Sequence, residues 1–410
     1  MNKNWTTKPL KYACDVNNQT LGEDTRSDWK MQYLDISAVN SEGSISDLEN
    51  HTFAKAPSRA RRRVRSGDTV ISTVRTYLKA IAHFDQPPEN LVASTGFAVL
   101  SPNGEASSRF LWRAVQSHGF ISKVVANSQG VGYPAIAPSR LASLSISFPS
   151  PADQLRIAAY LDEATGRIDR LVGLRRRQME LLREQRAALI QETVTRGLNP
   201  SAPLKDSGVP WLGAIPEHWE VKRCKVIFRE IDNRSTDGHE ELLTVSHLTG
   251  ITPRTEKDEV NMFLAETNEG YKKVEIGDLV INTMWAWMGA LGFSACCGIV
   301  SPSYNVYRFR RPNEPNYYGF LFRTATFIKE ITRYSTGIWE SRLRLYPQAF
   351  FEIRAPIPPL EEQQEILAHI QRETAKLDAL RRSYERQLTL LAEYRAALIH
   401  ECVTGQKEVD

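Results

Sequence analysis

Long apolar runs are missing from this sequence, and no stretch approaches the roughly eighteen consecutive apolar residues that a membrane-spanning helix needs. The opening residues, MNKNWTTKPL, also lack the apolar core of a secretory signal. Cysteine is scarce, with five in 410 residues and no C-x-x-C pair, and the adjacent Cys296 and Cys297 cannot easily bind one metal ion together. We therefore expect a cytoplasmic protein with reduced, structural cysteines, no metal site and no contact with a membrane.

The motifs of self-sufficient catalysis are missing as well. The chain has no G-x-x-x-x-G-K-[ST] loop to bind a triphosphate, and Gly130-Val131-Gly132 lacks the third glycine of a dinucleotide-binding turn. The run 85–88, DQPP, is superficially similar to the D/N-P-P-Y/F loop of amino-methyltransferases but lacks both the Asp or Asn next to the prolines and the aromatic residue. None of the eight histidines lies in an H-E-x-x-H motif or a recognisable triad. The sequence therefore predicts no catalytic residue and no cofactor on this chain.

A strong net charge is also absent. The 52 lysine and arginine residues nearly balance the 48 aspartate and glutamate residues, which leaves a net charge of +4. Any surface for nucleic acid therefore depends on local clustering of basic residues. The composition, 41% hydrophobic and 24% charged, is ordinary for a soluble globular protein. Because 410 residues exceed what one hydrophobic core usually organises, two or three domains are expected.

The most informative feature that is present is a long internal repeat. Residues 154–195 recur without a gap at 363–404, which is 209 residues further along the chain. The run 186–190, RAALI, is repeated letter for letter at 395–399. A proline-rich stop precedes each copy, at 149–151 and 356–359, and proline belongs at or before the start of a helix. Each copy is therefore expected to form a helix about 60 Å long.

Apolar residues in both copies follow alternating steps of four and three residues, which is the spacing of a coiled-coil seam. Each helix then has one apolar stripe to bury, and the other copy is its nearest equivalent partner. We expect the helices to pack as an antiparallel pair within the chain. The predicted seam positions are, in the first copy, Ile157, Leu161, Ala164, Ile168, Leu171, Arg175, Gln178, Leu182, Gln185 and Leu189, and, in the second, Ile366, Ile370, Glu373, Leu377, Leu380, Tyr384, Gln387, Leu391, Tyr394 and Leu398.

The segments between the helices repeat more loosely. Each opens with W-x-x-K-x-x-K, at 5–11 and 219–225, and later contains a Gly-Asp turn followed by a β-like run, at 67–73 and 277–283. The fold class is therefore α+β: two mixed α/β modules joined by two long helices packed as an antiparallel coiled coil, with pseudo-two-fold symmetry. The predicted domains are a first module at 1–148, a central helical region at 149–198, a linker and entry segment at 199–216, a second module at 217–357 and a C-terminal helical region at 358–410.

Basic residues are concentrated in one part of the first module. Within residues 59–79 a single acidic residue, Asp68, opposes seven basic ones. A run of this kind is either a solvated, mobile loop or a surface that contacts phosphate and bases; its position ahead of a strand favours the second interpretation. The residues of this cluster are Arg59, Arg61, Arg62, Arg63, Arg65, Arg75 and Lys79.

Aromatic and polar residues extend this candidate surface and provide a second one. In the second module, Trp285 and Trp287 correspond to Arg75 and Tyr77. If these residues continue a strand, alternation places the two tryptophans on one face, either in the core or on a contact surface. Arginine and aromatic side chains are common readers of base edges and backbone. The further candidates, in or after the loops at Gly130 and Gly337, are Gln129, Tyr133 and Arg140 in the first module and Thr336, Trp339, Arg342 and Arg344 in the second.

With these residues in place, the chain resembles the specificity subunits of type I restriction-modification systems over essentially its whole length. The segments that carry the resemblance are 210–219 (PWLGAIPEHW), the proline-rich approach to 361–363 (EEQ), 397–399 (ALI), 403–405 (VTG) and 72–78 (STVRTYL). The resemblance implies a non-catalytic subunit in which each recognition domain reads one half of an asymmetric, bipartite site on double-stranded DNA. It also implies two modification subunits, which bind S-adenosylmethionine, and two restriction subunits, which use ATP and Mg²⁺.

The helices are the most similar parts of the two halves, as expected if each contacts an identical partner. We therefore expect the modification subunits to dock there, on Arg186, Leu189, Arg395 and Leu398. Two other interpretations stay open, namely the recognition part of a fused type II restriction-modification enzyme and a coiled-coil scaffold that binds no DNA. Missing methyltransferase and nuclease motifs oppose the first, and the arginine cluster opposes the second.

Overall fold

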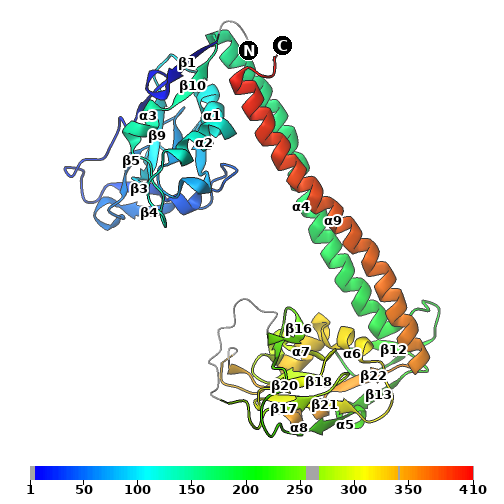
Figure 1. Cartoon of the computed structure of the whole chain (residues 1–410). Helices are drawn as coiled ribbons and strands as arrows, with labels where there is room; N and C mark the ends of the chain where they lie inside the picture. The colour runs from blue at the N-terminus through cyan, green and yellow to red at the C-terminus, as the bar shows by residue number, and fades with distance from the viewer. Residues whose placement is uncertain (1–4, 255–266, 340–341, 410) are drawn as a thin grey trace. The chain divides into compact units, whose positions relative to one another are not determined.

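The computed structural model describes residues 5–254, 267–339 and 342–409. The chain divides into two compact units, one formed by Met1–Arg177 with Tyr384–Asp410 (unit 1) and the other by Gln178–Ser383 (unit 2). The long helices α4 (Pro151–Arg196) and α9 (Leu360–Thr404) each contribute residues to both units (Figure 1). The compact units thus divide the chain differently from the predicted domains, which separate the helices from the modules; those boundaries stay predictions. Within the described residues, no helix has both the length and the apolar character needed to cross a membrane.

The predicted antiparallel pairing of the two helices is confirmed inside each unit. In unit 1, Ile157 and Leu161 near the start of α4 share a core with Leu398 and Ile399 near the end of α9. In unit 2 the order is reversed, because residues near the end of α4 share a core with residues near the start of α9. The α+β fold class predicted from the repeat is therefore correct. The α9 and α4 residues in the core of unit 2 are Ile190, Val194, Ile366, Leu367 and Ile370.

The predicted seam is wrong at two pairs of equivalent positions. Leu171 and Leu380 are exposed, as are Gln185 and Tyr394. Near the helix ends the buried face widens beyond a seam, since each helix also packs against a module. In the central part of α4 and α9, polar contacts replace the apolar stripe: the Arg175 Nε donates to Gln387 Oε1 at 2.7 Å, and its guanidinium lies 5.0 Å from the centre of the Tyr384 ring.

The first module contains two four-stranded sheets. Strands β3 and β8 are parallel to each other, and the other pairs are antiparallel. The Gly-Asp turn and the following strand, β6, lie where the sequence predicted them. Strand β3 ends at Leu34, because Asp35 accepts from the Ser37 backbone and starts a 3₁₀ helix. One sheet has the strand order β2 (Cys14–Val16), β9 (Phe97–Pro102), β6 (Thr69–Ser72) and β7 (Ile81–His83). The other has the order β4 (Glu49–Thr52), β3 (Lys30–Leu34), β8 (Leu91–Ser94) and β5 (Ala60–Arg63). Strand β1 (Thr6–Pro9) pairs with β10 (Ser145–Phe148), and the helices are α1 (Ser108–Gln116), α2 (His118–Ala126) and α3 (Pro138–Ser143).

The second module repeats the order of one of these sheets, with β14-β21-β18-β19 in place of β2-β9-β6-β7. The segment predicted as a linker is instead packed, because it forms the pair β11–β12 and buries Val209, Leu212 and Ile215. The four-stranded sheet consists, in order, of β14 (Phe228–Ile231), β21 (Tyr304–Phe309), β18 (Leu279–Asn282) and β19 (Leu291–Phe293). The paired strands are β11 (Leu204–Asp206) with β12 (Ala214–Pro216), β13 (Glu220–Arg223) with β22 (Arg354–Ile357), β15 (Leu243–Ser246) with β16 (Gly250–Pro253), and β17 (Lys272–Val274) with β20 (Gly298–Val300). The helices are α5 (Cys224–Ile227), α6 (Pro315–Phe322), α7 (Ala325–Tyr334) and α8 (Pro347–Glu352).

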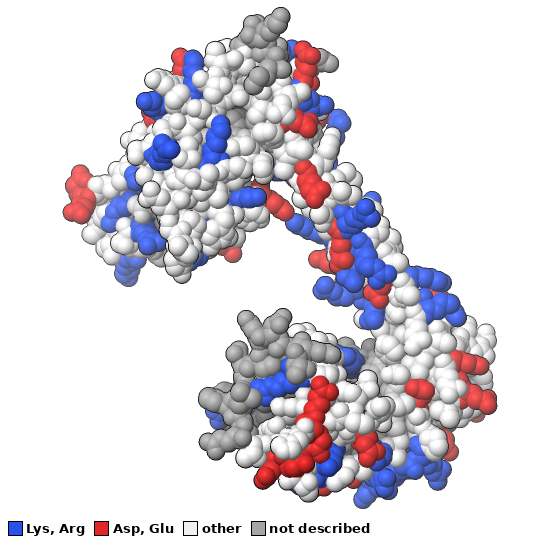
Figure 2. Space-filling view, in the orientation of Figure 1, with Lys and Arg blue, Asp and Glu red and all other residues white. Residues whose placement is uncertain are grey.

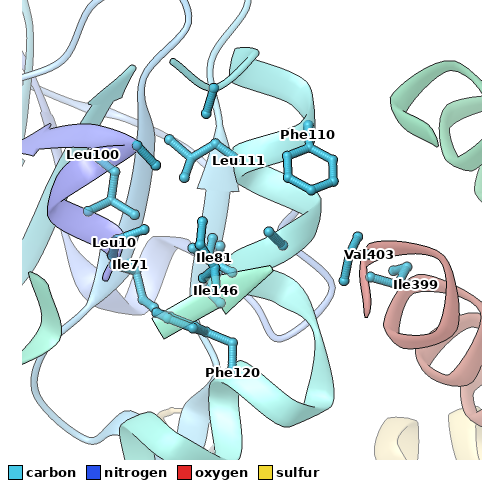
Figure 3. Packing of buried hydrophobic residues seen from close by; sticks show 14 of the residues in the cluster. Leu10, Ile71, Ile81, Leu100, Phe110, Leu111, Phe120, Ile146, Ile399 and Val403 are labelled. Atoms are coloured by element: carbon cyan, nitrogen blue, oxygen red, sulfur yellow. The ribbon is translucent and has the colours of Figure 1, made fainter. Parts of the chain in front are cut away.

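The core of unit 1 joins the module to the helices. Residues of β6, β7, β9, α1 and α2 meet in one cluster, and Ile399 and Val403 of α9 belong to the same cluster (Figure 3). Unit 2 has an equivalent core that includes Tyr317, Tyr318 and Phe322 of α6. Each module is therefore bound to its helix ends by apolar burial rather than by a flexible connection.

One glutamine fixes each helix to its module in the same way. Gln154 Oε1 accepts from the Ser107 backbone nitrogen at 2.8 Å, and its Nε2 donates to the carbonyls of Pro149 and Glu105. Gln363, at the equivalent position of the repeat, accepts from the Glu314 nitrogen at 2.9 Å and donates to the Pro358 carbonyl and Asn313 Oδ1. Both side chains are buried, so no water replaces these bonds.

Replacing either glutamine by alanine is expected to lower the free energy of unfolding by about 1–3 kcal/mol, because buried backbone groups lose their partners. Urea titration of Gln154→Ala and Gln363→Ala measures this change. The neighbouring Gln364 is exposed, and Gln364→Ala is the matched control with an expected change near zero. Equal midpoints for all three variants would contradict the assignment of these joints.

The helix ends also meet the module openings in a repeated way. In unit 2, a Cβ placed on Gly197, just after α4, would lie 3.2 Å from Trp219 Cζ2. In unit 1, a Cβ on Gly405, just after α9, would lie 3.3 Å from Trp5 Cδ2. Both glycines have positive φ, 75° and 74°, which lets the backbone turn tightly against the indole. The two ends of the described chain accordingly lie close together (Figure 1).

Candidate nucleic-acid interface

In the first module the candidate surface begins where β6 ends. The chain leaves the sheet after Ser72 and forms a 3₁₀ helix, Thr76–Leu78, between Arg75 and Lys79, whose φ angles are 50° and 54°. Thr76 is buried and its hydroxyl lies 2.9 Å from Ser128 Oγ, so the neighbouring Arg75, Tyr77 and Lys79 side chains are exposed. The premise that a strand continues through Tyr77 is wrong, because the turn ends it.

A loop closed at its base packs against this turn. The backbones of Gln129 and Ala135 exchange two hydrogen bonds of 2.8 Å, and the Arg75 nitrogen donates to the Pro134 carbonyl at 2.8 Å. The Arg75 guanidinium lies 4.7 Å from the centre of the Tyr133 ring. We call the exposed side chains of residues 75–79 and 129–133 the first turn–loop surface. It combines cationic and aromatic groups.

The other predicted residues of this module are only partly brought to that surface. Arg61, Arg62 and Arg63 lie on the edge strand β5, which contradicts the mobile-loop interpretation. Their side chains have separate contacts: Arg61 lies over the Phe53 ring, whereas Arg62 donates to Thr20 Oγ1 at 2.9 Å and burial lowers the pKa of its guanidinium. The cluster is therefore not one patch. Arg140 is exposed but donates twice to Asn127 Oδ1, and Arg59 and Arg65 are exposed.

Backbone hydrogen bonds connect the segment that contains Arg59 to the end of β6, where the first turn–loop surface begins. Its carbonyl accepts from the Thr95 nitrogen at 2.7 Å, and the next residue, Gly96, accepts from both the backbone nitrogen and the hydroxyl of Thr73. Lysine and arginine side chains are spread over the visible face of this module (Figure 2). Arg59 is thus the member of the run at 59–65 whose place in the fold best fits the candidate surface.

The second module builds the same arrangement from different residues. β18 ends at Asn282, and Trp285 precedes a 3₁₀ helix, Ala286–Met288. The backbones of Thr336 and Arg344 exchange two bonds of 3.0 Å and close a loop. The Leu345 nitrogen donates to the Thr283 carbonyl, as the Ile136 nitrogen donates to that of Thr73 in the first module.

The tryptophans of this module are not both in the core. Trp285 is 50% exposed, so the core alternative is wrong for it. Trp287 is half-buried, and its Nε1 donates to the Met284 carbonyl at 3.1 Å. A surface cavity of about 630 Å³ separates Trp285 from the loop. The exposed residues that form this second turn–loop surface are Trp285, Thr336, Ile338, Trp339, Arg342, Arg344 and Tyr346.

Two of the four predicted docking residues line cavities, one in each unit. Arg186 lines a cavity of about 860 Å³ in unit 2, and Arg395 lines one of about 520 Å³ in unit 1. Arg395 also donates to Asp169 Oδ1 at 3.2 Å. Leu398 is only 3% exposed, so its prediction as a direct contact is not supported by its position; its equivalent, Leu189, is half-buried.

Sequence reasoning missed three sets of residues. It assigned no role to Gln154 and Gln363, although they open the two copies of the repeat. It also missed the apolar tips of the two loops, and the exposed Leu181 and Leu390 at equivalent positions of α4 and α9. In each set the signal was identity or similarity between the repeats at residues outside the apolar pattern. Within the described part of the chain, no group of histidine, cysteine, aspartate and glutamate residues could hold a metal ion.

The fold and the paired surfaces define a two-module protein in which both modules share one pair of helices. No family model matches the chain. It is 24% identical over 350 residues to the putative type I restriction enzyme MjaX specificity subunit of Methanocaldococcus jannaschii. The aligned region covers 79% of this chain and 74% of that protein. The chain is thus similar to a curated specificity subunit over most of both lengths.

Solved structures extend the likeness to the whole fold. A chain described under complex assembly and conformational transition of the type I R-M system matches with a TM-score of 0.73 at 22% identity, over 99% of both chains. The HsdS subunit from Thermoanaerobacter tengcongensis matches with a TM-score of 0.57 at 21% identity, over 99% of this chain and 98% of that one. The predicted resemblance to type I specificity subunits is confirmed in sequence and in fold.

Proposed function

We propose that this chain is the DNA-recognition subunit of a type I restriction-modification complex. The observation that carries the proposal is the duplicated turn–loop surface, in which a turn after a strand lies beside a loop closed by two backbone hydrogen bonds in each module, with different side chains. Arg75 and Tyr133 contribute to the surface of the first module, whereas Trp285 and Trp339 contribute to that of the second. Two surfaces with a similar backbone arrangement but different side chains are suited to two half-sites of different sequence on double-stranded DNA.

The helices supply the contacts to identical partners in this proposal. Leu171 and Leu380 occupy equivalent positions of the repeat and are both exposed, as are Leu181 and Leu390. An apolar side chain left exposed at the same place in both copies is what two identical partner subunits require. We assign these positions, together with the cavities at Arg186 and Arg395, to two modification subunits.

Catalysis belongs to the partners under this proposal. The modification subunits bind S-adenosylmethionine, and two restriction subunits bind ATP and Mg²⁺, while this chain contributes no catalytic group. The complex acts on DNA in the cytoplasm. A chain of this kind should bind DNA without cofactor, and the absence of DNA binding at low salt would favour the scaffold interpretation instead.

Fluorescence anisotropy with duplexes selected from a random-sequence pool tests the proposal. The full-length chain is expected to bind, with affinity that falls as salt rises. Arg75→Ala should weaken recognition of one half-site by about 1–3 kcal/mol, and Trp285→Ala should weaken only the other, if each side chain touches bases.

Arg26→Ala is the matched control, since Arg26 is an exposed arginine of the first module that pairs with Asp28 outside the turn–loop surface. Equal weakening for every duplex sequence would assign Arg75 to phosphate rather than to bases. Unchanged affinity for both variants on every duplex would contradict the assignment of the two surfaces.

A further inference from the structure

Both closed loops present an aliphatic residue at the same place. Val131 directly follows Gly130, and Ile338 directly follows Gly337. They are exposed by 105% and 93% of their reference surface, whereas Leu248, the next large apolar residue among those described, reaches 75%. Two β-branched side chains fully in water contribute no burial to folding, so the fold does not explain them.

Backbone hydrogen bonds close both loops at the base. Two backbone bonds close each loop, at Gln129–Ala135 and at Thr336–Arg344. Gly130 has a φ of 104°, and a Cβ on Gly337 would lie 2.6 Å from the Arg342 carbonyl oxygen, so the chain must turn at both glycines just before the aliphatic residue. The tips are therefore presented outward by the geometry of the loop base.

Each loop also carries or contacts cationic groups. Arg75 lies against the same loop as Val131, and the loop of Ile338 carries Arg342 and Arg344. An exposed apolar tip on a loop that also carries or contacts cations complements a polyanion whose interior is apolar, namely stacked base pairs between phosphate backbones. Such a tip would be unsuited to plain phosphate contact, which needs only polar and charged groups.

We propose that Val131 and Ile338 are wedges that each module inserts between adjacent base pairs of its half-site. The inference rests on the proposed function and adds how the recognition sequence is chosen. Opening a base step costs a few kcal/mol, and pyrimidine–purine steps open most readily. Each half-site should therefore contain a pyrimidine–purine step under the wedge, selected by its ease of unstacking.

The test uses the full-length chain and duplexes that the wild-type chain selects from a random-sequence pool. 2-Aminopurine placed at successive positions reports unstacking as a rise in fluorescence on binding. The wild-type chain should give one such rise in each half-site. Val131→Ala and Ile338→Ala should each remove the rise in its own half-site and lower affinity by about tenfold, with unchanged thermal unfolding because neither side chain is buried.

Val125→Ala and Ile276→Ala, at exposed positions outside the loops, are the matched controls and should leave both readouts unchanged. Wild-type binding without a fluorescence rise at any position would overturn the wedge while leaving the proposed function intact. Lost affinity with the rise retained would also overturn it, and would indicate contact with thymine methyl groups instead. No binding of any duplex by the wild-type chain would overturn the proposed function and the wedge together.

Discussion

A chain carrying Leu161→Glu is expected to lose the folded state of unit 1. Leu161 lies in the core shared by α4, α9 and the first module, and its exposure is 0%. The substitution removes about 2–3 kcal/mol of leucine burial and places a carboxylate in the apolar core, at a large desolvation cost. Against a typical stability of about 5–15 kcal/mol, this loss is large enough to unfold the unit.

The repeat supplies the matched experiment in unit 2. Ile370 is the equivalent of Leu161, is also 0% exposed, and lies in the core of unit 2. Ile370→Glu should therefore unfold the second unit first. Limited proteolysis with mass spectrometry identifies which unit opens in each variant. Leu174→Glu, at an exposed position of α4, is the control and should leave both units protected. Protection of the first unit in Leu161→Glu would contradict the shared core.

The double variant Leu181→Glu with Leu390→Glu is expected to fold normally and to lose its modification subunits. These residues are 47% and 52% exposed at equivalent positions of α4 and α9, so the new charges stay in water while the chain is alone. In a complex they would be buried without partners, and binding should weaken by about 100-fold or more. Co-purification and isothermal titration with a modification subunit that binds the wild-type chain measure the effect.

Leu155→Glu is the control for this experiment. Leu155 is an exposed leucine of α4, but its equivalent in the repeat is Gln364, so the repeat gives no reason to expect a partner there. Full complex formation by the double variant would remove Leu181 and Leu390 from the docking surface. Unfolding of the double variant would instead show that these positions support the helical pair.

The long helices could be predicted from the sequence because the apolar period and the proline stops are local signals. The exact buried face could not, since it depends on what else packs on each helix: Leu380 and Tyr394 fit the seam pattern but are exposed, whereas Leu367 and Cys402 are buried against the modules. Hydrophobic spacing identifies a helix and its approximate face, but tertiary contacts decide how wide that face is.

The sequence predicted which residues form the candidate surfaces, but not the secondary structure that carries them. Arg75 and Trp285 were identified correctly as equivalent positions, yet both lie on turns rather than on a strand. In the first module, Arg75 and Lys79 adopt positive φ angles without being glycine, which no local sequence rule signals. Likewise Arg62 has the sequence context of a solvated arginine, but the edge strand β5 directs it against Thr20.

The contact between each helix end and a module tryptophan has a consequence for chain connectivity. In unit 2, Gly197 and Trp219 are joined through residues 198–218, whereas in unit 1 Gly405 meets Trp5 although nearly the whole described chain lies between them. Unit 1 is therefore a circular permutant of unit 2: the same packing is obtained from a continuous segment in one case and from two distant segments in the other. With a covalent bridge from residue 405 to residue 5, a single cut of the chain within 198–218 should be tolerated, because the contacts at each tryptophan already hold the two sides of the junction together.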